Sequence, residues 1–136
     1  MKGFDWKFVG SALMGLIITV LTVYALESLR HELYPPFTGQ PENVELINNY
    51  ISGAPFWSLV MVPLSWIIGA FCGTLLASLV HSSKKRSFFF IIAGLTTIAA
   101  CMMLIQYPSP WYFWILAMFI FPSSLLASRL VRSAEV

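Results

Sequence analysis

Four long apolar segments limit what this chain can fold into. They cover about residues 8–29, 56–80, 88–105 and 111–130, and a helix of ~20 apolar residues is enough to cross a bilayer. The whole chain is 58% hydrophobic and 10% charged, whereas soluble domains carry about 25% charged residues. The sequence therefore predicts an all-α polytopic membrane protein. We expect a single domain over residues 1–136, with four transmembrane helices in an antiparallel bundle.

The first segment has an alternative interpretation as a cleaved signal peptide, since Val23, Tyr24 and Ala25 place small residues at suitable positions. The apolar run extends from Phe8 to Leu26, which is longer than the about 7–15 residues of a signal-peptide core. We therefore expect this segment to be a signal anchor and the first span.

Small residues recur at every fourth position in the second segment, so they fall on one face of a helix. These residues are Ser65, Gly69, Gly73 and Ala77. The first segment carries a similar narrow face. Its members are Ser11, Gly15, Thr19 and Thr22. Because helices in lipid associate largely through close packing across small side chains, we expect the two faces to join the first two spans within one protomer. A pore-lining or oligomerising glycine zipper is the alternative.

Basic residues predict the orientation in the membrane, because loops rich in Lys and Arg stay in the cytoplasm. Arg30 alone lies on the side opposite to the termini. All other Lys and Arg residues lie on the side of the termini: Lys2, Lys7, Lys84, Lys85, Arg86, Arg129 and Arg132. We therefore expect a multi-pass protein of the cell inner (plasma) membrane, with both termini and the loop 81–87 in the cytoplasm and the loop 31–55 outside.

The outer loop is expected to contain a short amphipathic helix. Val44, Ile47, Tyr50 and Ile51 would form one apolar face of this helix. Such a helix would lie along the membrane surface or cover the ends of the spans.

Two pairs of residues inside the spans are expected to have structural roles. Pro63 and Pro122 should kink their helices, because proline removes a backbone donor and clashes with the preceding turn. Cys72 and Cys101 lie in apolar segments at different depths, so we expect two free thiols and no disulfide.

The main polar cluster lies at the outer end of the first segment, where Glu27 and His31 share a helix face and Arg30 is three residues from Glu27. One interpretation is a metal or ligand site in which Glu27 and His31 act with a third group. The candidates for this group are Glu42, Glu45 and Gln106. The favoured interpretation is a surface ion-pair cluster that fixes the helix end, because so short a motif is a weak signal.

A second polar group, Lys84, Lys85 and Arg86, follows the second segment. These residues can bind anionic lipid head groups. The favoured interpretation is that they only set the topology of the chain.

The central part of each segment contains no charged or amide side chain. Proton relays and ion-coupled carriers hold ionisable groups at this depth, whereas hydroxyls can bond to their own helix without any function. The sequence also contains no Ser-His-Asp order, no CxxC motif, no phosphate-binding loop and no nucleic-acid-binding patch. We therefore expect no enzymatic activity, no cofactor and no nucleic-acid partner.

Several short motifs together resemble those of a group of small bacterial four-span inner-membrane proteins that are usually left as hypothetical. The motifs are Glu27 with His31, Tyr34-Pro35-Pro36 with Gly39, Gly69 with Gly73, and Pro108-Ser109-Pro110-Trp111. This resemblance implies a bacterial inner membrane and adds no activity. In size and span number the chain also resembles the small multidrug resistance transporters, which work as dimers and carry an essential glutamate in the middle of the first span. Here Gly15 to Thr19 occupy that depth.

These observations predict a non-catalytic protein of the lipid bilayer. The leading expectation is a structural, assembly or accessory subunit that packs against itself or against another membrane protein. The alternatives are a homo-oligomeric transporter or channel for a small or lipid-like solute, and a binding site at Glu27 and His31.

Overall fold

Helices account for most of the described chain. The computed structural model describes residues 3–40 and 42–134, and this part of the chain forms helices and no β-strand. Four helical stretches are long and apolar enough to cross a membrane, and they cover Trp6–Leu33, Phe56–Val80, Ser82–Gln106 and Trp111–Val131. The predicted all-helical fold with four helices of membrane-spanning length is therefore confirmed. Lys2 and the side chain of Arg132, two of the basic residues counted for orientation, lie outside the described part.

A capping carboxylate and a proline set the boundaries of the first helix. α1 (Trp6–Leu33) begins after Asp5, whose side chain accepts a 3.0 Å hydrogen bond from the Phe8 backbone N–H. The helix ends before Tyr34, since a residue that precedes a proline, here Pro35, disfavours the helical conformation.

A capping side chain and a proline also mark where the next two helices begin. α2 (Val44–Gly53) begins after Asn43, whose side chain accepts a 3.1 Å hydrogen bond from the Leu46 backbone N–H. α3 (Phe56–Val80) starts directly after a proline, and the short 3₁₀ helix η1 (Ser82–Lys84) joins it to α4 (Lys85–Gln106).

The fourth span consists of two helices. α5 (Trp111–Ala117) and α6 (Ile120–Ala134) are separated by a turn at Met118 and Phe119. Pro122 has no backbone N–H that could bond to the Met118 carbonyl four residues earlier, so the regular helical hydrogen bonds stop at this turn. α3, by contrast, continues through its buried proline.

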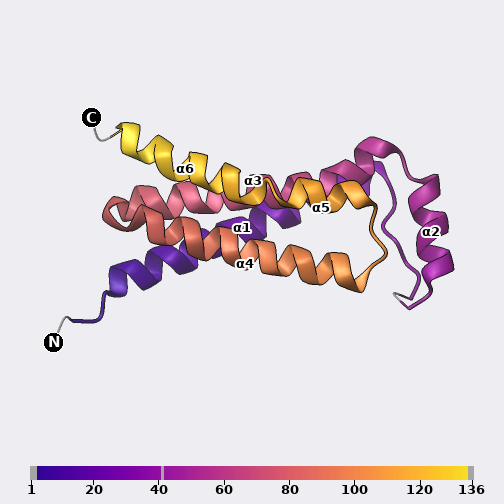
Figure 1. The fold of residues 1–136 in the computed structure, drawn as a ribbon, viewed down its shortest axis with the longest axis horizontal. Coiled ribbons are helices and arrows are strands. Elements are labelled where there is room, and N and C mark those ends of the chain that lie inside the picture. The colour runs from indigo at the N-terminus through magenta and orange to yellow at the C-terminus, as the bar shows by residue number, and fades with distance from the viewer. Residues whose placement is uncertain (1–2, 41, 135–136) are drawn as a thin grey trace.

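The long helices alternate in direction along the bundle. α1 and α4 run toward α2, and α3 and α5–α6 run back (Figure 1). The end where the described chain begins and finishes is called the terminal end below, and it also contains η1. The opposite end is called the α2 end, and it contains the turn 107–110 between α4 and α5. α4 and α5 separate from each other as they approach the α2 end (Figure 1).

α3 is the central helix of the bundle, because it contacts α1, α4 and α6. Its largest contact is with α1. With the exception of Trp66, the buried residues of α3 are small or are proline. They are Ser58, Pro63, Ser65, Gly69, Ala70, Gly73, Thr74, Ala77 and Ser78. Small side chains on this helix let the neighbouring backbones come close.

The backbones of α1 and α3 touch through the two small-residue faces. A Cβ atom added to Gly69 would lie 2.8 Å from Val23 Cγ2 and 3.0 Å from the Thr19 carbonyl oxygen. A Cβ atom added to Gly73 would collide with Thr19 Oγ1 and with the Gly15 carbonyl oxygen. There is therefore no room for a side chain at either glycine.

The other members of these faces lie on the same surfaces. On α1, Ser11, Gly15 and Thr19 are buried and Thr22 is half-buried, and on α3 Ala77 is fully buried. The Thr19 hydroxyl donates to the Gly15 carbonyl oxygen at 2.9 Å, so its polar group is satisfied within α1.

Replacing Gly73 by leucine is expected to prevent stable folding, whereas Gly94 of α4 should accept the same change. The first added carbon at Gly73 meets the α1 backbone, and overpacking of a tight contact typically costs about 1–3 kcal/mol. A Cβ atom at Gly94 meets nothing within 4 Å. Size-exclusion profiles and thermal unfolding in one mild detergent measure the difference. A Gly73→Leu protein that behaves like the Gly94→Leu protein would show that the α1–α3 contact is dispensable.

Candidate functional site

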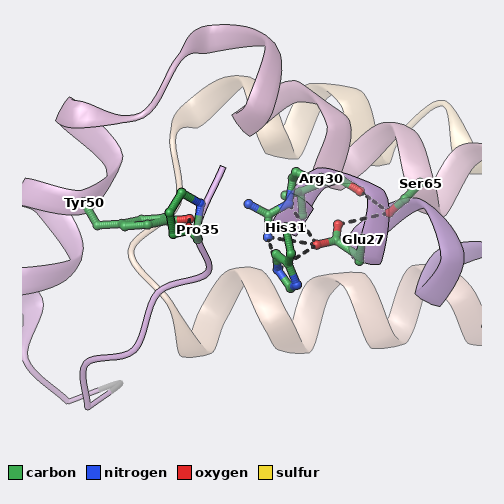
Figure 2. Close-up of polar contacts among 7 residues, drawn as sticks. Glu27, Arg30, His31, Pro35, Tyr50 and Ser65 are labelled. Atoms are coloured by element: carbon green, nitrogen blue, oxygen red, sulfur yellow. Dashed lines mark hydrogen bonds and ion pairs between the residues drawn. The ribbon is translucent and has the colours of Figure 1, made fainter. Parts of the chain in front are cut away.

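A part-buried ion pair lies at the α2 end of α1. The Glu27 Oε2 atom accepts a 3.0 Å hydrogen bond from Arg30 Nε and lies 2.9 Å from Arg30 Nη2 (Figure 2). The exposed fraction of the Arg30 side chain is 10% and that of the Glu27 side chain is 23%. Two contacts from one guanidinium to one carboxylate oxygen at this burial make a strong, charge-assisted pair.

His31 extends this pair toward the surface. Its Nε2 atom lies 2.8 Å from Arg30 Nη2. Because a guanidinium only donates, Nε2 must accept, and the imidazole proton belongs on Nδ1. His31 Nε2 also lies 3.9 Å from Glu27 Oε2. His31 thus orients Arg30 and keeps one donor for another partner.

Ser65 brings α3 into the cluster. Its hydroxyl donates to the Val62 carbonyl oxygen at 2.6 Å and lies 3.4 Å from Glu27 Oε1. The longer distance is near the limit of a hydrogen bond. Glu27 Oε1 therefore keeps the capacity to accept a hydrogen bond from a bound molecule.

This cluster forms one wall of a cavity of about 380 Å³. Most of the remaining wall is apolar or aromatic and comes from the α2 region, α3, α4 and α5. The aromatic members are Phe37, Tyr50, Trp66, Tyr107 and Phe113. Prolines on both sides of the cavity, among them Pro36 and Pro108, stiffen its rim.

Tyr50 attaches α2 to the chain that follows α1. Its hydroxyl donates to the Pro35 carbonyl oxygen at 2.7 Å (Figure 2). Its ring centroid lies 5.5 Å from that of Tyr34 and 5.6 Å from that of Phe37. These contacts hold α2 in place, so that Ile47 and Tyr50 become part of the cavity wall.

The structure brings together some of the predicted site residues and leaves others apart. Glu27, Arg30 and His31 meet as their spacing on one helix face requires. Glu42 and Glu45, candidates for a third ligand, do not line the cavity, and neither does Gln106. Within residues 3–40 and 42–134, no three His, Cys, Asp or Glu side chains lie together as a metal-binding group.

Sequence reasoning missed two contributors to the site. The sequence predicts only a helix-packing role for Ser65, yet this residue also contacts Glu27. Trp66, its neighbour, is a buried side chain that lines the cavity. The signal in the sequence was that Ser65 is the member of the small-residue face nearest the start of α3, level with the charged end of α1.

The predicted head-group residues lie at the opposite, terminal end. Lys84 and Arg86 are exposed, and Lys85 is half-buried. Lys85 and Arg86 line a surface hollow of about 410 Å³ together with Ser128 and Arg129 of α6. They are thus separated from the Glu27 cluster by the length of the bundle (Figure 1).

Comparisons of the chain with models of protein families, with curated proteins and with solved structures gave no match. The resemblance to the small four-span bacterial proteins therefore stays a prediction.

The Glu27–Arg30 pair can be tested by a double-mutant cycle. Glu27→Gln and Arg30→Gln are each expected to lower stability by about 1–3 kcal/mol, because each leaves a buried partner unsatisfied. The double variant should lose less than the sum of the two single losses. Thermal unfolding in one detergent gives the values, and Glu32→Gln, at an exposed glutamate of the same helix, is the control. Additive losses would show that the two side chains are energetically independent.

Proposed function

We propose that the four helices cross the cell inner membrane as an antiparallel bundle, with the α2 end outside and both termini in the cytoplasm. The distribution of basic residues supports this orientation. Lys7, the run 84–86 and Arg129 belong to the helix ends at the terminal end, whereas Arg30 is the one Lys or Arg of the described part at the α2 end. Such residues are enriched on the cytoplasmic side of membranes. In this orientation α2 covers the outer ends of the spans.

We further propose that the protein acts by binding a small molecule at its outer end, as an accessory protein without catalysis of its own. The observation that carries this proposal is the cavity that joins aromatic walls to the Glu27–Arg30 pair. Its volume of about 380 Å³ lies in the ~300–1,000 Å³ range of ligand pockets. A few polar groups in an apolar wall are also typical of such pockets.

The threonine hydroxyls of the first span do not support a transport path along α1. Thr19 Oγ1 donates to the Gly15 carbonyl oxygen at 2.9 Å, and Thr22 Oγ1 donates to the Ile18 carbonyl oxygen at 2.7 Å. Because these hydroxyls bond to their own helix, they do not form a polar path across the bilayer. A homo-oligomeric transporter, the alternative, would need such a path between protomers.

Filling the cavity is expected to release a bound molecule. Val62 lines the cavity, and Val60 of the same helix lines a shallow hollow on another face. Native mass spectrometry of the chain, extracted from membranes in a mild detergent, should detect a non-protein mass bound to the parent and to Val60→Phe. Val62→Phe should lose this mass, because its larger ring occupies the space.

Both variants must elute as folded protein for this comparison. The proposed function would be wrong if the parent carries no added mass, or if Val60→Phe and Val62→Phe retain it equally.

A further inference from the structure

A second hollow lies beside the cavity, between α1 and α4. It is a groove of about 440 Å³ with mainly apolar walls. Leu16, Val20 and Val23 of α1 form one side, and Leu95 and Ala99 of α4 form the other. Val20, Leu95 and Ala99 are exposed side chains, so the groove is open toward the lipid that surrounds the bundle.

The groove and the cavity meet at three residues that line both of them, namely Glu27, Trp66 and Met103. Because Glu27 lines both hollows, the Glu27–Arg30 pair lies at the junction between the apolar groove and the cavity. A molecule placed across this junction would have its polar part at the pair and an apolar part along α1.

On its terminal side the groove is bounded by a contact between α1 and α4. Nearer the terminal end, the rings of Phe8 and Phe88 stack with centroids 5.2 Å apart, and a Cβ atom on Gly15 would lie 2.7 Å from Ile92 Cδ1. From Leu16 to Glu27, α1 makes about three turns, or about 16 Å. This length is about half of the ~30 Å hydrocarbon core. The groove therefore has the depth of a single lipid leaflet.

The charges at the junction carry both signs. Glu27 Oε1 can accept from a cationic group, and the Arg30 guanidinium with the His31 Nδ1–H can donate to an anionic one. A fatty acid would place its carboxylate beside Glu27, and a simple amine would place its charge beside Arg30. A zwitterionic head group avoids both repulsions, because each of its charges can face the opposite charge.

We propose that the cavity and the groove together bind one phospholipid of the outer leaflet that has a zwitterionic phosphate–ammonium head group. The head group contacts Glu27, Arg30 and His31, and one acyl chain lies in the groove between α1 and α4. The second acyl chain remains in the bilayer, because the groove is open on its lipid side. This inference rests on the proposed function, and it names the class of molecule that the site takes.

Phospholipids that differ only in the head group test the proposed head-group preference on the unsubstituted chain. The full chain, delipidated in a mild detergent, is mixed with phosphatidylethanolamine or with phosphatidylglycerol that has the same acyl chains. Native mass spectrometry should show one tightly retained phosphatidylethanolamine, about tenfold preferred over phosphatidylglycerol. Equal retention of the two lipids, or retention of neither, would overturn the proposal.

Substitutions in the groove test the acyl-chain part. Ala99→Phe and Val20→Phe fill the groove from opposite sides, and Ala25→Phe adds the same ring at an exposed alanine of α1 outside it. The two groove variants should retain phosphatidylethanolamine about tenfold less than the parent, since the loss of two buried methylene groups has an effect of that size. Ala25→Phe should retain it as the parent does.

Two other outcomes would count against the proposal. Groove variants that bind the lipid normally but change a dimer into a monomer would show that a second copy of the chain occupies the groove. If Val62→Phe releases a bound molecule while both groove variants retain it, the outer-end binding site stands and the phospholipid assignment is wrong. If Val62→Phe releases nothing either, the proposed function fails as well.

Discussion

The close approach of α1 and α3 is the contact on which the other helix positions depend. Lipid offers no hydrophobic drive for helices to associate, so their attraction comes from dispersion forces between closely packed atoms. Gly15 on α1 and Gly73 on α3 let the two backbones touch, and a side chain at either position would force them apart. α3, held in this way, also contacts α4 and α6, and its buried surface consists mainly of small residues. The bundle is therefore built around α3.

The same contact creates the site at the α2 end. Ser65 continues the small-residue face of α3 and reaches Glu27, so helix packing and the polar cluster share one surface. α4 contacts α1 near the terminal end through Phe8 and Phe88, and it leaves a groove beyond that point. The cavity and the groove thus follow from the tight α1–α3 pair and from the space left between α1 and α4 beyond their contact at the terminal end.

Glu27 and Arg30 are tolerated in a part-buried position because they pair with each other. Burial of a lone charge in a medium of low dielectric constant is costly, whereas Glu27 and Arg30 compensate each other at 2.9 Å. Tyr50 attaches α2 to the segment that follows α1 through its hydrogen bond to the Pro35 carbonyl oxygen, and residues of α2 line the same cavity as the pair. The result is a polar group that is partly shielded from water yet still has free hydrogen-bonding capacity, which is the condition for a ligand site.

The sequence by itself determined the all-helical fold and the number of helices that are long enough to cross a membrane, because apolar length and charge content are local properties of the chain. It also placed Glu27, Arg30 and His31 on one helix face, since helical spacing alone decides that. Only the tertiary structure decided that Trp66 lines a cavity, that Glu42 and Glu45 stay outside it, and that a groove lies between α1 and α4. These features depend on the distances between helices, which are set by the packing of side chains from different segments and are not encoded in any one of them.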